Sequence, residues 1–316
     1  MQLKQWGAFI LLGLIWGTSF VWIKIAVAEI SPFTLVAFRL TVAFLGLLVI
    51  MRLTGQSFPR DRKTWPAFAV MGLLNTALPF TLISWGETRI ASGLASILNG
   101  TVPLFIIVIA HFWLHDEKIA LKRLSGLLVG FVGTVILVSR DIGLEGLHGN
   151  LWGQLAVIAA SASYATAYTF ARRYMRGTSP VVQSAMQMLI GGSIMWLSFP
   201  AAAAARPVVP LAQPVFSLPA LPLTWVAIVW LGLLGSCLAF VLMFYLVNEW
   251  GPTRASVVTY IFPIVGLILG LVLLNETLDW RLLGGSALIV AGIGVMNLRP
   301  PARRAPAAAP AMGRGR

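Results

Sequence analysis

The chain has 316 residues, of which 58% are hydrophobic and only 10% are charged. In soluble domains about a quarter of the residues are charged, so a water-soluble fold could not cover this much apolar surface, and that class is excluded. In a soluble protein, the formal net charge of +13 would suggest a nucleic-acid partner. Here the basic residues lie between hydrophobic segments, where membrane topology places them, so we expect a lipid bilayer as partner and no nucleic acid.

Ten segments are long and apolar enough to cross a bilayer, which takes about 20 residues each. In chain order they cover residues 6–27, 33–51, 66–86, 91–113, 122–139, 150–171, 181–199, 223–246, 254–274 and 281–298. Ala26-Val27-Ala28 resembles a signal-peptidase site, but the apolar run before it is too long for a leader and Lys24 interrupts it. The predicted fold class is therefore an all-α integral membrane protein with ten transmembrane helices.

The distribution of Lys and Arg predicts the orientation in the membrane. With the N-terminus inside, the outer side carries only Arg89, Arg140, Arg206 and Arg281, and most other basic residues fall inside. The positive-inside rule then places both termini in the cytoplasm. The tail 299–316 lacks apolar periodicity, so we expect a disordered, basic cytoplasmic segment. Short loops and an Ala-, Gly- and Arg-rich composition indicate the inner (plasma) membrane of a bacterium.

The second half of the chain repeats the first in order. Trp16-Gly17-Thr18 matches Tyr164-Ala165-Thr166, and the later matches are Lys24 with Arg172, Pro32 with Pro180, Phe80 with Phe240, Ala95-Ser96 with Ala255-Ser256, and Pro103 with Pro263. The predicted repeats cover residues 1–139 and 150–298. Because each repeat has an odd number of helices, five, the second enters the membrane from the opposite side. Inverted repeats of this kind recur in secondary transporters, whose halves rock around a central site.

The predicted fourth and ninth helices carry the same polar pattern. One face of the fourth holds Ser92, Ser96, Asn99 and Pro103, and one face of the ninth holds Pro252, Ser256, Thr259 and Pro263. A proline inside a helix frees the carbonyl four residues earlier, here that of Asn99 or Thr259. Such groups are tolerated at membrane depth where they meet protein or a water-filled cavity. We predict that Ser96, Asn99, Pro103, Ser256, Thr259 and Pro263 contact the substrate; helix–helix hydrogen bonding is the alternative.

Aromatic side chains cluster on the predicted first and sixth helices. Trp16 with Ser19, and Tyr164 with Tyr168, lie on helical faces that the repeat relates. Such side chains can line a cavity and stack on a ligand, and positions facing lipid or the membrane interface are the alternative. The predicted third helix adds two weaker candidates for substrate binding, Asn75 and Pro79.

Two basic residues fall within predicted helices. Lys24 is near a helix end, from which it can reach the interface, whereas Arg39 lies about two turns into its helix. An ionisable residue at that depth indicates function, so Arg39 is a candidate for binding a substrate carboxylate, with Glu29 and Glu87 as alternative partners. Gln187 stands at the matching place in the second repeat, so a role of Arg39 is not symmetric. No Asp or Glu falls at mid-membrane in this assignment, which leaves the coupling ion open.

The chain resembles the EamA-type drug/metabolite transporter superfamily over residues 6–298. The likeness is carried by Trp16-Gly17-Thr18-Ser19-Phe20, Lys24, Pro32 and Arg39, by Pro103 through His115-Asp116-Glu117 to Gly126 and Gly133, and by Pro263 through Asn275-Glu276-Thr277 to Gly285 and Gly292. The resemblance implies ten helices, a central cavity, and movement of amino acids, related metabolites or drugs, often outward. It does not fix the substrate.

We therefore expect a secondary carrier, independent of ATP, that moves small metabolites such as amino acids across the inner membrane by alternating access, without catalysis or a cofactor. The alternatives are a membrane-embedded enzyme and a channel or scaffold. An enzyme needs a nucleophile–base pair or metal ligands, and no third histidine lies near His111 and His115. Close helix packing, within the protein or in a homodimer, is predicted for Gly126, Gly130, Gly133, Gly284, Gly285 and Gly292.

Overall fold

The computed structural model describes residues 3–115, 119–139, 151–204, 213–262, 264–265 and 280–297. Over these residues the chain is helical and has no strand. The first half contains α1 (Leu3–Val27), α2 (Pro32–Leu53), η1 (Arg62–Thr64), α3 (Trp65–Gly72), η2 (Leu73–Ala77), α4 (Leu78–Glu87), α5 (Ser92–Asn99), α6 (Val102–Trp113) and α7 (Leu121–Val138). The second half contains α9 (Leu151–Tyr174), α10 (Pro180–Ala204), α11 (Pro222–Gly232), η3 (Leu233–Leu238), α12 (Ala239–Trp250), α13 (Pro252–Ser256), η4 (Val257–Tyr260) and α15 (Trp280–Asn297).

Six of these helical stretches are long and apolar enough to cross a membrane. They are Leu3–Val27, Pro32–Leu53, Arg62–Glu87, Ser92–Trp113, Pro180–Ala204 and Pro222–Trp250. The prediction of an all-α membrane protein is thereby confirmed. The count of ten remains a prediction, because α7, α9 and α15 are helices at predicted places but are not among the six, and the predicted span 254–274 lies partly outside the described residues.

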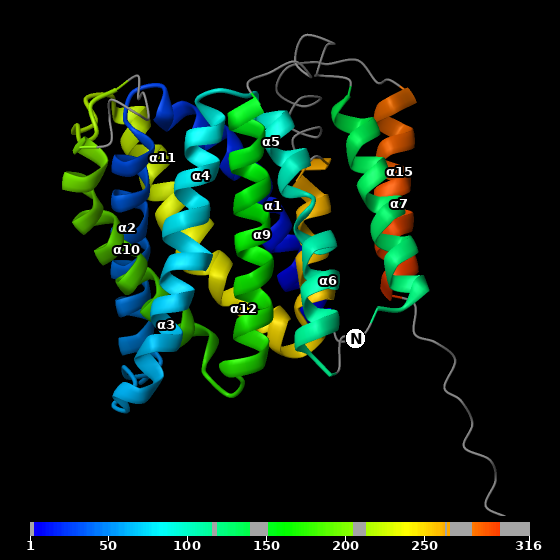
Figure 1. Ribbon diagram of the computed structural model, residues 1–316, viewed down its shortest axis with the longest axis horizontal. Helices are drawn as coiled ribbons and strands as arrows, with labels where there is room; N and C mark the ends of the chain where they lie inside the picture. The colour runs from blue at the N-terminus through cyan, green and yellow to red at the C-terminus, as the bar shows by residue number, and fades with distance from the viewer. Residues whose placement is uncertain are drawn as a thin grey trace, which may run out of the picture.

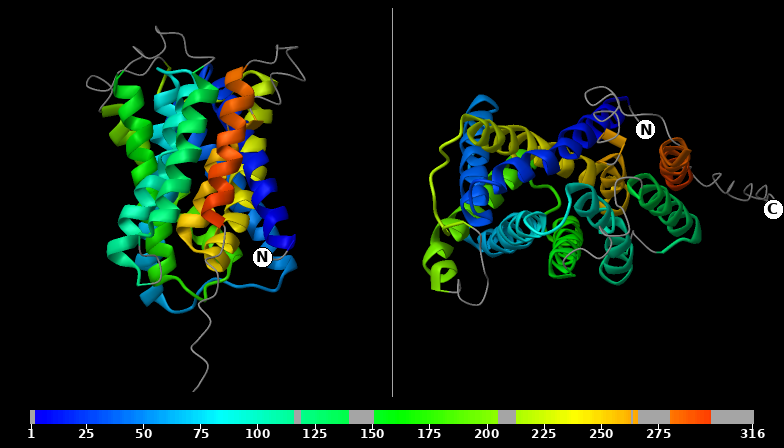
Figure 2. Two further views of the ribbon diagram at one scale, coloured as in Figure 1. Left: turned by 90° about the vertical axis from the view of Figure 1, so that its right-hand side faces the viewer. Right: turned by 90° about the horizontal axis from the view of Figure 1, so that it is seen from above.

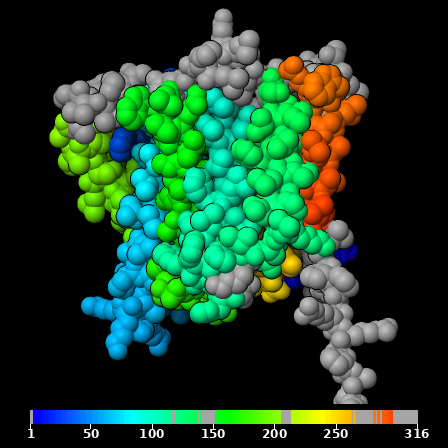
Figure 3. Space-filling model, turned by 45° about the vertical axis from the view of Figure 1, so that its right-hand side comes forward, coloured from blue at the N-terminus to red at the C-terminus, as the bar shows by residue number. Residues whose placement is uncertain are grey.

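The helices run side by side along one axis and connect at two ends (Figure 1). The N-terminus of the chain and the C-terminal end of α9 lie at the lower end, and the connection between α4 and α5 lies at the upper end. Seen from above, α7 and α15 form a pair at one edge of the bundle (Figure 2). Their packing is close because glycines face each other: a Cβ on Gly133 would lie 2.7 Å from the Gly285 carbonyl oxygen, and one on Gly292 would lie 2.6 Å from the Gly126 carbonyl oxygen. Figure 3 shows the two helices in contact along their length.

Several predicted helices are interrupted where the sequence analysis expected continuity. The fourth segment divides at Gly100 and Thr101, because Pro103 is a first-turn residue of α6 and cannot donate a backbone hydrogen bond. The third and eighth segments each contain a π-helical stretch, η2 and η3. These two stretches occupy matching places in the two repeats. Local π-helix is common at functional sites because it widens the turn and re-aims the backbone carbonyls.

Candidate functional site

A cavity lies where the two halves meet. About 50 Å³ of it is accessible to the centres of water molecules. Its walls come from both halves: Trp16, Ser19, Phe20, Ile23, Arg39, Phe80, Ile83, Asn99, Val102, Tyr164, Tyr168, Met243, Ser256, Val258, Thr259 and Phe262. The space suffices for a few water molecules, whereas a small-molecule site typically offers about 300–1,000 Å³. The cavity in this structure is therefore too small for such a ligand and has to expand to admit one.

The cavity brings together most of the side chains that the sequence analysis selected. Those on the wall are Trp16, Ser19, Arg39, Asn99, Tyr164, Tyr168, Ser256 and Thr259. The remaining described candidates, Asn75, Pro79, Ser96 and Pro103, do not line it. Pro263 lies outside the described residues.

Arg39 is the most constrained polar group in the cavity. Its side chain is 4% exposed, and its Nε donates to the Ser236 hydroxyl at 2.7 Å. Its Nη2 donates to the Gly235 carbonyl at 3.3 Å, and its Cζ lies 3.8 Å from the centroid of the Phe80 ring. Trp16 Nε1 donates to the same Gly235 carbonyl at 2.9 Å. The π-helical stretch η3 thus supplies both oxygens that hold the guanidinium.

A matching contact joins the second repeat to η2, with a neutral side chain in place of the arginine. Gln187 stands on α10 where Arg39 stands on α2, and it meets η2 as Arg39 meets η3. The Asn75 side-chain amide donates to Gln187 Oε1 at 2.9 Å, and the Thr76 hydroxyl lies 3.5 Å from the Gln187 carbonyl oxygen. Asn75 is therefore explained as a partner of Gln187 instead of a cavity wall residue.

Aromatic rings form much of the wall. Tyr164 and Tyr168 stack with centroids 5.9 Å apart, and Phe80 lies 6.4 Å from Tyr164. Trp16 meets Phe240 edge to face at 5.4 Å. Among the wall residues that sequence reasoning missed, Ile83, Val102, Met243 and Phe262 are apolar side chains in apolar helices, with no local signal to separate them from lipid-facing ones. Phe80 did carry a signal, because it matches Phe240 in the repeat.

Two polar groups of the cavity are left with hydrogen-bonding capacity. Thr259 Oγ1 is buried without a hydrogen-bond partner among the described residues. Asn99 has one recorded contact, from the Ser161 hydroxyl to its Oδ1 at 3.5 Å, at the limit for a hydrogen bond. Buried polar groups usually find partners, so these two are suited to bind water or a ligand.

Matched basic residues make related contacts near the two ends of the bundle. At the upper end, Lys24 Nζ donates to the backbone carbonyls of Glu87 at 2.5 Å and Ile90 at 3.0 Å. At the lower end, Arg172 Nη1 donates to the Asn248 carbonyl at 2.9 Å. Lys24 and Arg172 match in the repeat, and each binds carbonyls at the C-terminal end of a helix from the third segment of a repeat, where a cation is favoured by the helix dipole.

The carboxylates considered as partners of Arg39 are bound elsewhere. Glu29 accepts from the backbone N–H groups of Ala220 and Leu221 and from the Thr224 hydroxyl. The Thr224 hydrogen bond is the main cause that lowers the pKa of Glu29, and the two N–H groups act in the same direction. Glu87, the last residue of α4, is fully buried, and it accepts from the Ser92 hydroxyl at 3.1 Å. Within the described residues, Arg39 forms no ion pair with a carboxylate.

The histidine pair considered as a metal site does not gather further ligands in the described part of the chain. There, His111 Nδ1 accepts a backbone hydrogen bond from Ile119 at 3.2 Å. No group of three His, Cys, Asp or Glu side chains that could hold a metal occurs among those residues. The described wall of the cavity, in contrast, offers one cation, several hydroxyl and amide groups and aromatic rings, which are groups suited to contact an organic solute.

A bundle of apolar helices around a central cavity is the architecture of a multi-pass membrane protein. The EamA-like transporter family model matches residues 5–139 and again residues 151–298. The chain therefore belongs to the EamA-like transporter family, which confirms the resemblance.

Similar proteins have transporter names. The inner membrane transporter YedA of Escherichia coli strain K12 is 29% identical, over 89% of this chain and 88% of that protein. The transporter YoaV of Bacillus subtilis strain 168 is 26% identical, over 89% and 92%. A probable terminal-alkyne amino-acid exporter of Streptantibioticus cattleyicolor is 26% identical, over 96% of each chain. One solved crystal structure matches with a TM-score of 0.74 at 20% identity, covering 94% of this chain and 97% of its own, which shows a shared fold.

Proposed function

We propose that the protein is a secondary carrier that exports small metabolites, amino acids or related compounds, across the inner membrane by alternating access. The observation that carries the proposal is the cavity whose walls come from both halves, with the matched contacts of Lys24 and Arg172 near opposite ends of the bundle. A carrier needs a central site that opens to one side at a time. In this proposal the two contacts act as gates that open alternately.

The duplicated architecture supports the mechanism. The family model matches the chain twice, over 5–139 and 151–298, close to the proposed repeats 1–139 and 150–298. The pairs Arg39–η3 and Gln187–η2 each join one half to the other. If the halves are inverted copies, exchanging their conformations converts an outward-open form into an inward-open one. The ten-helix inverted arrangement remains part of this proposal.

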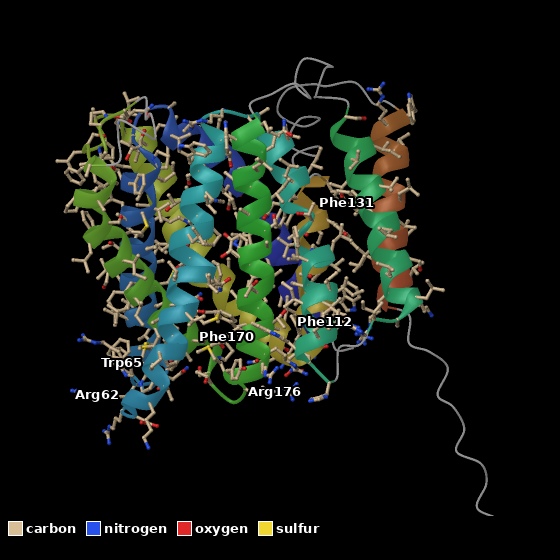
Figure 4. All side chains as sticks on the ribbon, viewed as in Figure 1. Arg62, Trp65, Phe112, Phe131, Phe170 and Arg176 are labelled. Atoms are coloured by element: carbon tan, nitrogen blue, oxygen red, sulfur yellow. The ribbon has the colours of Figure 1, made fainter. Side chains whose placement is uncertain are left out.

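The orientation is also part of the proposal. Figure 4 shows Arg62 and Arg176 at the lower end of the bundle, the end that carries the N-terminus. The helix ends on that side are also basic: α9 carries Arg172 and Arg173 in its last turn, and α7 carries Lys122 and Arg123 in its first turn. The positive-inside rule assigns such an end to the cytoplasm, which places Lys24 at the outer end and Arg172 at the inner one.

Reconstitution tests the carrier proposal directly. Liposomes are preloaded with a mixed set of metabolites and amino acids, and mass spectrometry follows which compounds leave, against protein-free liposomes. We expect selective, saturable loss of a few compounds. Asn99→Ala and Thr259→Ala should slow that loss because they remove cavity polar groups, whereas Ser193→Ala, on the exposed face of α10, should not.

Equal rates of compound loss in all three variants would contradict the assignment of the cavity as the substrate site. No selective loss from folded, inserted protein with any compound of the set would favour the enzyme or scaffold alternatives, and non-saturable loss would favour a channel.

A further inference from the structure

Among the described residues that line the cavity, Arg39 is the one with a charged side chain, and none is Asp or Glu. A buried cation at membrane depth is costly unless it is compensated. The Ser236 hydroxyl, the Gly235 carbonyl and the Phe80 ring compensate part of the charge, but none of them carries a negative charge. Among the described residues no carboxylate forms an ion pair with Arg39, and the buried Glu87 acts on it only through a longer-range electrostatic interaction. The cavity wall itself therefore carries a positive charge with no acid beside it.

The guanidinium is also held in one orientation with one edge left available. Nε and Nη2 are fixed by η3, and the ring of Phe80 covers one face. Among the described residues, Nη1 makes no hydrogen bond. Arg has five N–H donors in a planar fork, so the Nη1–Nη2 edge retains donors for a carboxylate, which such an edge binds with two parallel hydrogen bonds.

We propose that Arg39 selects the substrate by its carboxylate, and that the cavity binds organic molecules with a single carboxylate on an apolar or aromatic body. This inference rests on the proposed carrier function and names its substrate class. The carboxylate occupies the Nη1–Nη2 edge, and the body of the molecule packs against Trp16, Tyr164 and Tyr168.

The asymmetry between the repeats limits the charge to one. Gln187, the counterpart of Arg39, is neutral and directed to η2. A second carboxylate in the cavity would therefore meet no second cation and would lose its hydration without compensation. A positively charged amine alone would meet Arg39 as a like charge.

The wall also determines what the amino group of an amino acid contributes. Because the described wall residues include no acid, an ammonium group finds uncharged polar groups there, such as the side chains of Thr259 and Asn99. Amino acids and the corresponding acids without the amino group are then both ligands, and the amino group is not required.

The test uses purified full-length protein in detergent and four probes with the same phenyl body: phenylalanine, 3-phenylpropionate, phenethylamine and phenylsuccinate. Calorimetry and thermal stabilisation report binding. We expect the amino acid and the monocarboxylate to bind and to compete with each other. The amine should bind at least about tenfold more weakly because it loses the charge-assisted hydrogen bond, and the dicarboxylate should do so because its second carboxylate is buried without a cation.

Arg39→Gln places the counterpart residue at this position and should weaken carboxylate binding about 10- to 100-fold. Arg39→Lys keeps the charge without the fork, so its affinity should fall between the two. Arg89→Gln removes an arginine outside the cavity and serves as the matched control, with unchanged affinity.

Three results would overturn the inference: binding of phenethylamine as tight as that of 3-phenylpropionate, unchanged affinity in folded Arg39→Gln, or no carboxylate binding by protein that exports neutral or cationic compounds from liposomes. Protein that moves no compound at all in that liposome assay would contradict the carrier function instead. The two failures are thus distinguishable.

Discussion

The π-helical stretches η2 and η3 occupy matching places in the two halves, and each holds a side chain from the second long helix of the other half. At η3 that side chain is Arg39, bound by a hydroxyl and a carbonyl and exposed to the cavity. At η2 it is Gln187, which pairs with Asn75 and does not reach the cavity. The comparison shows that both repeats use a π-helical stretch to bind a side chain of the other half, whereas only the first half places a charged side chain on the cavity wall.

The largest expected effect comes from making the two half-sites alike. Gln187→Arg would bury a second guanidinium where η2 offers Asn75 and Thr76 but no anion, and an uncompensated buried charge costs about 3–5 kcal/mol. We expect a marked drop in thermal unfolding temperature in detergent, with Gln187→Met as the neutral control of similar length. An Arg variant as stable as that control would mean that η2 can bind a cation as η3 does.

The two end contacts permit a second comparison. Removing the cation at one end while keeping the other should bias the protein toward opening at the altered end, by about tenfold for a hydrogen bond from a charged group. A single cysteine is placed in the cavity by Thr259→Cys with Cys237→Ala, and a membrane-impermeant thiol reagent is added from either side. Lys24→Met should raise labelling from the upper end, and Arg172→Met from the lower end. Equal labelling from both sides in both variants would contradict the assignment of these contacts as gates.

A smaller effect is expected from the group that orients Arg39. Ser236→Ala removes the acceptor of Arg39 Nε, so carboxylate affinity should fall about two- to tenfold, as for one hydrogen bond. Thr76→Ala is the matched change in the other half, and its hydroxyl mainly donates to the Gly72 carbonyl. We expect that variant to keep its affinity. Equal losses in the two variants would show that both half-sites serve binding.

The smallest effect concerns the loop at the upper end. The hydrogen bonds of Glu29 lower its pKa from 4.5, so its stabilising contribution is present above about pH 4.5 and is lost as the pH falls through the lower folded value. The thermal unfolding temperature of the parent should therefore fall more steeply with acidification below that pH than the unfolding temperature of Glu29→Gln. Parallel pH profiles would show that these hydrogen bonds do not stabilise the folded protein.

The sequence was informative where a pattern repeats along the chain. Apolar length predicted the helices, and the internal repeat selected Trp16, Tyr164, Asn99 and Thr259, all of which line the cavity. Family resemblance, carried by motifs such as Trp16-Gly17-Thr18, was confirmed by the family match.

The remaining features depend on contacts between distant segments. Whether Ile83 or Met243 faces the cavity or lipid is decided by packing, because an apolar side chain suits both. The partners of Glu29, at residues 220–224, lie far along the chain and carry no motif. The π-helical stretches were also not predicted, since their residues have no composition distinct from α-helix. Asn75 was selected as a polar residue in an apolar helix, and the structure shows that its side-chain amide donates to Gln187 Oε1.

The central claim, that one cavity opens alternately at two ends, is tested most directly by distances between spin labels. One pair, Ala28 and Thr88, spans the end closed by Lys24, and a second pair, Tyr174 and Glu249, spans the end closed by Arg172. In lipid, the account predicts that substrate changes both distance distributions and that a long distance at one end occurs with a short distance at the other. Long distances at both ends together, or distributions that do not respond to any exported compound, would contradict it.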